Sequence, residues 1–318
     1  MKRIKHMTMI FGTITVLLVP VVFNVMENNN KKDNNQTTLL SNENEVIIEP
    51  TKNDKPQKKQ VDTFASDKDE IWHKMLNTVD YYDSIDGEFF YSISSIDDVY
   101  AVSFNADIDS SKAFSNASKL EINDINNLVT SIQLNEFPEF KKAGSFDLSL
   151  YSDGENYYKI NNIDNTYTTY KYAAIKKIDS IAEDDKSRFT IREDGIPCYS
   201  YRPDSTNAYL AKRCIFPQEM AFGYLANFDL WEIKGTEKIF NRECYVITGN
   251  TSDDYGKKTG VNSFEFYIDK ETGTLLKYYG YDQSNNLCDF LIISKINFNS
   301  PQEIIAPDFN KYIENSDF

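Results

Sequence analysis

Between residues 230 and 298 the chain is divided into short runs of alternating aromatic and polar residues, separated by turn sequences at nearly even spacing. Such alternation is typical of β-strands with one apolar and one polar face, and short connections join them in antiparallel order. In "FYIDKETGTLLKYYGYD" (266–282), Gly273 can adopt the positive φ that a tight turn between two strands needs. We therefore expect strands at 230–249 (two strands joined near Asn241), 263–269, 274–282 and 288–298, in meander order.

The first half of the chain carries the same strand signal with longer connections. A hairpin is expected at 145–160, because "SDGE" (152–155) offers a glycine turn between two strand-like runs. Further strands are expected at 87–93, 98–104 and 166–172, which brings the total to about ten. Two short helical segments are predicted between the halves, at 171–184 and at 216–227.

The clearest helix signal precedes the first strand, at 66–82. Ser66 followed three residues later by Asp69 resembles a capping box, with acidic residues in the first helical turn. Apolar residues then recur at steps of three and four, which places them on one broad face. These residues are Ile71, Trp72, Met75, Leu76, Val79 and Tyr82. A helix with this face must pack against an apolar surface.

The strands predict a sheet with one aromatic face, because successive side chains on a strand alternate between its two sides. Phe264, Phe266 and Ile268 share one side of their strand. The same rule groups four residues of the last strand: Phe290, Ile292, Ile296 and Phe298. One long helix and two short ones cannot cover a flat sheet of this width. We therefore expect an α+β fold, mostly antiparallel β, whose sheet curls around its helices, an arrangement that often leaves a lined hollow.

The N-terminus predicts export. Lys2, Arg3 and Lys5 precede an uncharged run from Met7 to Met26, long enough to cross a bilayer as a helix. No A-x-A-like cleavage site ends the run and no cysteine lies near it, so we expect an uncleaved signal-anchor, with a poorly recognisable signal peptide as the alternative. The expected organisation is a cytoplasmic N-terminus (1–7), a transmembrane signal-anchor (8–26), a polar disordered tether (27–65) and an extracytoplasmic folded domain (66–318).

Charge excludes one class of partner. The chain has a formal net charge of −15, and the first 26 residues contribute +3 and residues 27–65 contribute −1, so residues 66–318 carry −17. So acidic a surface repels phosphate backbones, and we expect no nucleic-acid partner.

The four cysteines all lie in the exported half, where an oxidising compartment favours disulfides. Their spacing lacks the paired pattern of a zinc site. Cys198 and Cys214 are the expected pair, because Pro197 and Pro203 mark a loop that can bring them together. Cys244 and Cys288 each lie inside a strand-like run, and either buried thiols or a second bridge would fit them.

Catalytic motifs are absent from the sequence. It contains no nucleophile elbow, metalloprotease helix, phosphate-binding loop or dinucleotide fingerprint. A serine or cysteine nucleophile needs a general base within hydrogen-bond reach. The chain has only two histidines, His6 and His73, to serve as that base. In so acidic a domain, adjacent acidic residues such as Asp253 and Asp254 are expected in solvated loops and not as a catalytic pair. We expect no enzyme activity, no cofactor and no metal.

Several segments carry a family resemblance. They are Gly87–Phe89, "WEIKGTE" (231–237), "RECYVITG" (242–249), the 266–282 unit quoted above and "INFN" (296–299). Together they resemble the LolA/RseB-like superfamily of bacterial lipoprotein carriers and sigma-factor regulatory proteins. The resemblance implies an unclosed β-barrel whose concave side, filled by helices, accepts acyl chains or apolar side chains. The expected anchor and tether depart from the diffusing carriers, and no functional residue of the family maps onto this chain.

Two functions follow as hypotheses. In the first, the half-barrel is a membrane-anchored binding module that holds an acyl chain, lipid, lipoprotein or apolar peptide. Its expected lining is Trp72, Met75, Phe264, Phe266, Ile268, Leu276, Tyr278, Phe290 and Ile292. In the second, the domain is an envelope sensor that acts on a membrane signalling partner through protein contacts, because a tether keeps it near the membrane.

Overall fold

The structure, a computed structural model, describes residues 64–92, 98–122, 127–128, 130–131, 141–170, 174–177, 185–193, 195, 197–300 and 302–315. The predicted cytoplasmic N-terminus and signal-anchor lie outside these residues, as does nearly all of the predicted tether. Among the residues that are described, no helix combines the length and the apolar character needed to cross a bilayer.

One sheet of twelve strands dominates the described chain, in the order β14-β6-β5-β4-β3-β2-β1-β13-β12-β11-β10-β9. Neighbouring strands are antiparallel except at the β14·β6 edge, which is parallel. The strands of the first half are β1 (Ser84–Ser92), β2 (Val99–Asp107), β3 (Lys112–Leu120), β4 (Lys142–Asp153), β5 (Tyr157–Asn161) and β6 (Thr166–Tyr170). Those of the second half are β9 (Trp231–Ile239), β10 (Arg242–Asn250), β11 (Ser263–Asp269), β12 (Leu275–Tyr281), β13 (Leu287–Phe298) and β14 (Ile313–Glu314).

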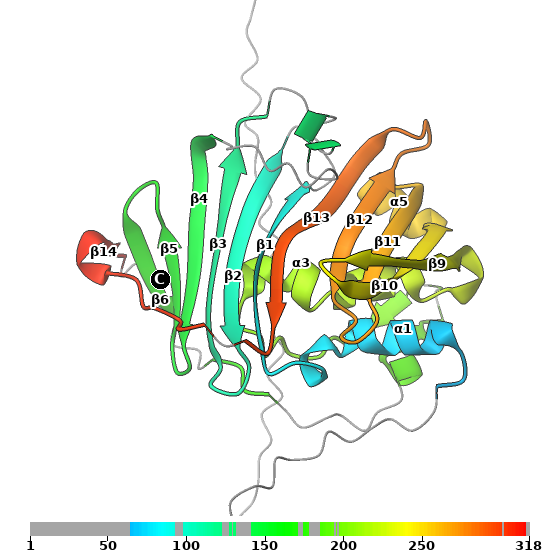
Figure 1. Ribbon diagram of the computed structural model, residues 1–318, viewed down its shortest axis with the longest axis horizontal. Coiled ribbons are helices and arrows are strands. Elements are labelled where there is room, and N and C mark those ends of the chain that lie inside the picture. Colours follow the sequence, from blue (N-terminus) through cyan, green and yellow to red (C-terminus); the bar gives the residue numbers. More distant parts are fainter. Residues whose placement is uncertain are drawn as a thin grey trace, which may run out of the picture. The chain divides into compact units, whose positions relative to one another are not determined.

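The sheet is curved and does not close, because β14 and β9 are its two free edges (Figure 1). This is the predicted mostly antiparallel, unclosed half-barrel, with twelve strands where about ten were expected. The helices on the concave side are α1 (Asp67–Leu76), η1 (Thr78–Asp80), η3 (Tyr209–Ala211), α3 (Lys212–Ile215), α4 (Gln218–Met220), η4 (Ala221–Leu225) and η5 (Phe228–Leu230). Outside this group lie α5 (Asp253–Thr259), η2 (Asp185–Arg188), η6 (Phe309–Lys311) and the small β7–β8 hairpin (Phe189–Ile191, Pro197–Tyr199).

Helix α1 begins as the sequence predicts but ends earlier. The Ser66 hydroxyl accepts the Asp69 N–H, which is the expected N-cap. The helix stops at Leu76, not at residue 82, because Asn77 leaves the helical conformation and the chain continues as the 3₁₀ turn η1. Val79 and Tyr82 are nonetheless fully buried, so the predicted apolar face is real although its last turn is not α-helical.

Two hydrophobic clusters lie on opposite sides of the sheet. The larger, concave cluster joins α1, α3, α4 and η4 to the inner side of the strands. The smaller, outer cluster contains Val99, Leu120, Leu128, Tyr279, Phe290 and Ile292. Leu291 and Ile293 of β13 belong to the concave cluster, and so does Ile296. The side that faces the helices therefore changes along β13.

A β-bulge at Ser294 causes this change of side. Glu88 pairs with Lys295 and Phe89 pairs with Ile293, so Ser294 has no partner in the register, and its hydroxyl donates to Glu88 O at 3.1 Å. One extra residue reverses the alternation on either side of it. The prediction that Phe290 and Ile292 share a face with Ile296 and Phe298 was therefore wrong.

Most predicted strands are confirmed, and the 263–269 strand has the expected bounds. The helical segment expected at 216–227 is present as α4 and η4. Of the helix expected at 171–184, only 174–177 is described, and these residues are not helical. Strand β3 was missed because its inward residues Ala113, Ser115 and Ala117 are small, and they give a weak hydrophobic alternation. The shorter elements β7, β8, β14 and α5 were missed as well.

Candidate functional site

The nine residues predicted to line a hollow are all buried, with exposed fractions of 4% or less. Seven of them lie in the concave cluster: Trp72, Met75, Phe264, Phe266, Ile268, Leu276 and Tyr278. Their side chains pack on one another and on the helices. In this closed arrangement they form a core.

Phe290 and Ile292 do not join the other seven. They lie in the outer cluster because of the bulge at Ser294, so a ligand on the concave side would meet Leu291 and Ile293 instead. The predicted lining was therefore wrong at these two positions.

Tyr278 ends in a buried polar group at the centre of the concave side. Its hydroxyl lies 2.6 Å from the Tyr224 hydroxyl and 3.3 Å from Asp289 Oδ2. Arg213 pairs with the same Asp289 oxygen at 2.6 Å and donates to Ser92 O at 2.8 Å. Burial raises the pKa of Asp289 although the Arg213 charge opposes this. These buried polar partners orient the aromatic side chains of the concave cluster.

Part of the concave side is covered by a segment with little burial of its own. We call residues 185–193 and 197–203, which contain η2, β7 and β8, the cover hairpin. No residue of β7 or β8 is buried, and Ile191 and Tyr201 are 65% and 52% exposed. Beneath it lies Phe222, which is 2% exposed and whose ring is 5.1 Å from that of Tyr199 and 5.4 Å from that of Tyr201.

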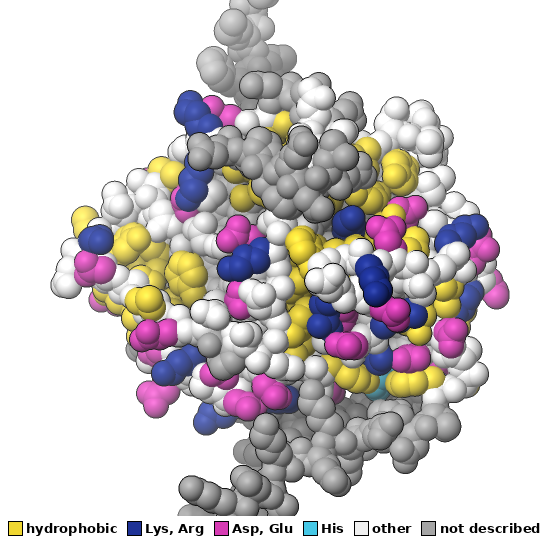
Figure 2. All heavy atoms as spheres, viewed as in Figure 1, with side chains coloured by type: hydrophobic (Ala, Val, Ile, Leu, Met, Phe, Trp, Pro, Cys, Tyr) yellow, Lys and Arg dark blue, Asp and Glu magenta, His cyan; other side chains and the backbone are white. Residues whose placement is uncertain are grey.

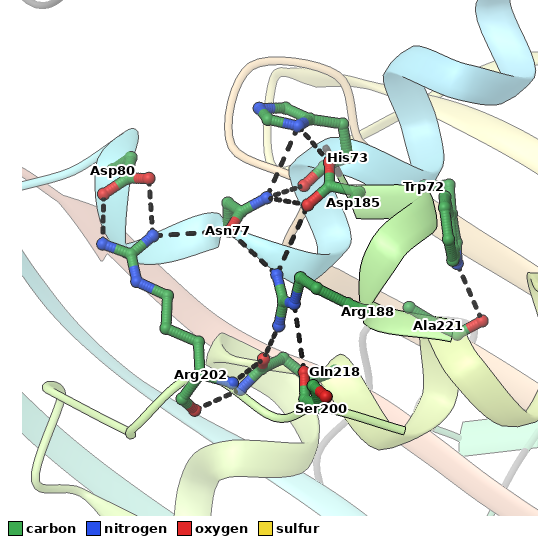
Figure 3. Close-up of polar contacts among 10 residues, drawn as sticks. All are labelled: Trp72, His73, Asn77, Asp80, Asp185, Arg188, Ser200, Arg202, Gln218 and Ala221. Carbon is green, nitrogen blue, oxygen red and sulfur yellow. Dashed lines mark hydrogen bonds and ion pairs between the residues drawn. The ribbon is translucent and has the colours of Figure 1, made fainter. Parts of the chain in front are cut away.

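The first attachment of the cover hairpin is the ion pair between Arg202 and Asp80. Arg202 donates two hydrogen bonds to the Asp80 carboxylate, at 2.6 and 2.8 Å (Figure 3). The Arg202 side chain is 3% exposed and the Asp80 side chain 25%. Gln218 of α4 adds two bonds to the Arg202 backbone, both at 2.8 Å. The hairpin is thereby held to η1 on one side and to α4 on the other.

The second attachment centres on Arg188, which lies between Asn77 and Gln218 in Figure 3. Arg188 donates to Asn77 Oδ1 at 3.2 Å, to the Gln218 side chain, and to Ser200 O at 3.1 Å. It also pairs with Asp185 at 3.4 Å. The hairpin is therefore fixed to itself, to the C-cap of α1 and to α4 by the same guanidinium.

Asp185 completes the attachment to α1. Its carboxylate is hydrogen-bonded to the His73 ring and accepts the Asn77 amide at 3.0 Å. Burial by itself raises the pKa of Asp185, but the His73 and Asn77 hydrogen bonds and the Arg188 charge outweigh burial, and the net pKa is lowered. The ionised carboxylate is the form that holds the hairpin.

Such an attachment suits a segment that opens. Buried ion pairs contribute little net stability, because the desolvation of both charges offsets their attraction, yet they specify one geometry. Opening returns both members of each pair to water. It would uncover Phe222 and then Trp72, whose rings lie 6.1 Å apart. Trp72 also contacts Phe228, at 5.9 Å between ring centroids.

Sequence reasoning identified Trp72 as a member of this site but missed the arginines and their partners. Arg188, Arg202 and Asp185 lie far from α1 in the sequence, in a segment without hydrophobic periodicity, and no local pattern relates them to Asn77 or Asp80. The contact between His73 and Asp185 was not foreseen either. Within the described residues, no cluster of three His, Cys, Asp or Glu side chains is placed to hold a metal ion.

The four cysteines are unpaired in the structure, which contradicts the predicted Cys198–Cys214 bridge. Cys198 is exposed on β8, whereas Cys214 is fully buried in α3, within the concave cluster. Their side chains therefore lie in different environments, and the loop between them does not bring them together. Cys244 is a buried thiol, one of the two outcomes left open for it, and Cys288 is a half-buried one.

Comparison with known proteins finds likeness in structure alone. No protein-family model and no curated protein matches the sequence. A complex of MucA and MucB from Pseudomonas aeruginosa matches with 14% identity and a TM-score of 0.37, over 75% of this chain and 59% of that chain. LprF from Mycobacterium bovis matches with 10% identity and a TM-score of 0.35, over 75% of this chain and 97% of that chain. The lipoprotein LppX from Mycobacterium tuberculosis matches with 12% identity and a TM-score of 0.34, over 76% and 100%.

These low identities and TM-scores leave the superfamily a prediction from the sequence. The chain spans 59% of the length of the matched MucB-complex chain. Ligands and partners of this protein have to be argued from its own residues.

Proposed function

We propose that residues 64–318 form a non-catalytic extracytoplasmic binding module that takes up an acyl chain or another apolar segment on the concave side of its sheet. The cover hairpin opens, the segment enters beside Trp72 and Phe222, and the hairpin closes over it. The expected signal-anchor and tether would keep the module at the membrane, where such ligands are found.

The observation that carries the proposal is the contrast between the cover hairpin and what it covers. The hairpin is attached through charged and amide groups, and no residue of its two strands is buried. The surface beneath is aromatic and almost fully buried. An apolar ligand that replaces the hairpin's aromatic contacts gains about 25 cal/mol for each Å² of apolar area buried. Elements with few buried contacts are also those that open most readily.

Native mass spectrometry of the 64–318 unit, before and after delipidation, tests whether a ligand is held. Uptake is followed with a dansyl-labelled fatty acid in the Trp231→Phe variant, where Trp72 remains as the single tryptophan of the unit. Energy transfer from Trp72 to the dansyl group is expected, because the proposed entry lies beside that ring. A clean apo mass together with no transfer in the folded unit would refute the proposal.

A matched pair of variants tests the role of the cover hairpin. Arg202→Met removes the contact with Asp80, so uptake should be several-fold faster because the hairpin opens more often. Lys234→Met removes a charge of the same sign from an exposed pair with Glu232, far from the hairpin in sequence, and should leave the uptake rate unchanged. Equal rates in the two variants would show that ligand enters by another route.

A further inference from the structure

The C-terminal segment forms a second covering, on the outer face of the sheet. We call residues 302–315 the C-terminal strap. Figure 1 shows it crossing in front of the first-half strands, on the side away from α3, to end beside β6. Asn105 of β2 donates to Gln302 O at 3.4 Å at one end, and the Tyr312 hydroxyl donates to Asn162 Oδ1 at 2.9 Å near the other. The strap therefore spans the strands from β2 to β6.

An aromatic residue anchors the strap. The Phe309 ring lies 4.9 Å from the rings of Tyr158 and Tyr167 and 6.4 Å from that of Tyr151. We call these three residues the tyrosine cluster. They come from three adjacent strands and project from the outer face, which Figure 2 shows to be rich in hydrophobic side chains over β4 to β6. The cluster accepts one aromatic side chain.

Beyond Phe309 the strap pairs with the edge of the sheet. Strand β14 runs parallel to β6, with Ile313 opposite Thr166 and Glu314 opposite Tyr167. Ile313 N–H donates to Asn165 O at 2.9 Å, and Asn315 N–H donates to Tyr167 O at 2.8 Å. A paired stretch of two residues is short for a strand. The backbone groups of this edge would accept any extended segment in the same register.

The strap fits its surface incompletely. A pocket of about 440 Å³ remains between it and the sheet, with Phe114 and Ile160 on the sheet side and Ile304 and Tyr312 on the strap side. Two apolar residues of the strap are largely exposed, Ile305 at 74% and Ile313 at 71%. The outer face thus offers more apolar contact than the strap uses.

The charges of the strap also match the surface poorly. It carries Glu303, Asp308 and Glu314 against a single lysine, Lys311. Strands β4 to β6 with their turns carry four acidic residues and two lysines. Like net charge on the strap and on these strands weakens their association, although Glu314 accepts a hydrogen bond from the Thr169 hydroxyl at 3.2 Å. A basic segment would be favoured at the same place.

From this geometry we propose that the outer face is a docking surface for a basic, extended peptide segment of a partner protein. The segment inserts an aromatic side chain into the tyrosine cluster, runs parallel to β6 and displaces the C-terminal strap. The strap is the resident occupant of the surface and competes with the partner. This inference concerns the face opposite the cover hairpin and does not depend on the proposed uptake of an apolar ligand.

The test uses the 64–318 unit, whose hydrophobic clusters are built from its own residues, and the same unit truncated after Gln302. Two labelled peptides are compared by fluorescence anisotropy: residues 303–315, and the same peptide with Glu303, Asp308 and Glu314 changed to lysine. The lysine peptide should bind the truncated unit about tenfold more tightly than the native peptide at low salt, and this advantage should shrink at high salt. Binding to the full unit should be at least tenfold weaker, because the strap competes.

Three outcomes would overturn the proposal. One is a truncated unit that keeps its circular dichroism spectrum but binds neither peptide. Another is equal affinity for the two peptides, which would exclude a preference of this surface for a basic segment. The third is unchanged affinity when Phe309 of either peptide is replaced by alanine, since the tyrosine cluster would then play no part.

Hydrogen exchange on the full unit keeps the test decisive if truncation prevents folding. The amides of Ile313 and Asn315 should exchange at least tenfold faster than those of the β4–β5 ladder, because strap opening does not require unfolding. Added lysine peptide should raise their exchange further. Equal protection of the strap and the ladder would show that the strap is a permanent part of the sheet.

Discussion

The two coverings of the sheet differ in how they are attached. On the concave side the cover hairpin is held by charged and amide groups around Arg188 and Arg202, which are themselves buried. On the outer face the C-terminal strap is held by the Phe309 ring, by a two-residue strand, and by hydrogen bonds that Asn105, Thr169 and Tyr312 donate. The first depends on ionisation and the second on apolar contact and backbone pairing.

This difference predicts that the two coverings respond to different changes. A buried charge must keep its partner, so the cover hairpin closes in a single position and responds to the removal of either charge. An aromatic ring in a cluster of tyrosines can be replaced by another ring, so the strap can be exchanged for a similar segment. Substitutions at the two coverings should therefore have separate and different effects.

The largest effect is expected from Asp80→Ala. It leaves the Arg202 guanidinium, in a side chain that is 3% exposed, without its carboxylate. Removing one partner of a buried pair should lower the free energy of unfolding by about 3 kcal/mol, measured by urea denaturation. Glu232→Ala breaks the exposed pair with Lys234 and serves as the control, with an effect below about 1 kcal/mol. Similar values for both would mean that Arg202 remains solvated.

Phe309→Ala should act on the strap alone. Loss of the ring contacts with the tyrosine cluster should weaken strap closure by about 1–2 kcal/mol, seen as faster hydrogen exchange at Ile313 and Asn315. Exchange in the cover hairpin should not change, because the two coverings share no contact among those described. Phe240→Ala, at an exposed aromatic in the β9–β10 turn, is the control. Faster exchange in both coverings would contradict their independence.

Acid should open the cover hairpin before the strap. Because the pKa of Asp185 is lowered in the folded protein, its contribution is complete above the ordinary value of 3.8 and is lost as the pH falls through the folded value. Trp72 fluorescence in the Trp231→Phe variant should shift to the red as the pH falls below 3.8. In Asp185→Asn the shift should be reduced, because that side chain no longer titrates. An unchanged titration in this variant would assign the transition to other carboxyl groups.

The smallest effect is expected from Ile313→Thr. This side chain is 71% exposed although it lies in β14, so its replacement should change the free energy of unfolding by no more than about 0.5 kcal/mol. Backbone pairing with β6 is retained, because threonine also favours strands. A loss above about 1 kcal/mol would show that the strap edge is held more tightly by side chains than its exposure indicates.

The sequence was sufficient for the fold because the fold depends on local patterns. Strand alternation, the Gly273 turn and the Ser66 cap each act within a few residues. Gly273 has a φ of 77°, as its turn requires, and a side chain there would meet the Lys74 backbone at 2.3 Å. Strand β3 was not predicted, because its inward residues are small and give a weak pattern. They have to be small because helix η3 packs against them.

The candidate site was predictable only in part. Trp72 was found because its helix face is periodic, but Arg188, Arg202 and Asp185 gain their partners through tertiary contacts with residues more than 100 positions away. The tyrosine cluster had the visible strand pattern of β4, β5 and β6, whereas its occupant Phe309 lies in a segment without periodicity. Contacts between a patterned element and an unpatterned one are the kind that sequence reasoning misses.

The unpaired residue Ser294 has a consequence for how this chain tolerates change in length. Before the bulge, the even-numbered residues Phe290 and Ile292 of β13 face the outer cluster, whereas after it the even-numbered Ile296 faces the concave cluster. The two ends of the strand must keep this difference. Deletion of Ser294 would turn the apolar side chains at one end of the strand toward water. Insertion or deletion of two residues at a time would keep both hydrophobic clusters. Relatives should therefore differ in this strand by even steps, and an alignment that ignores the kink will compare inward positions with outward ones.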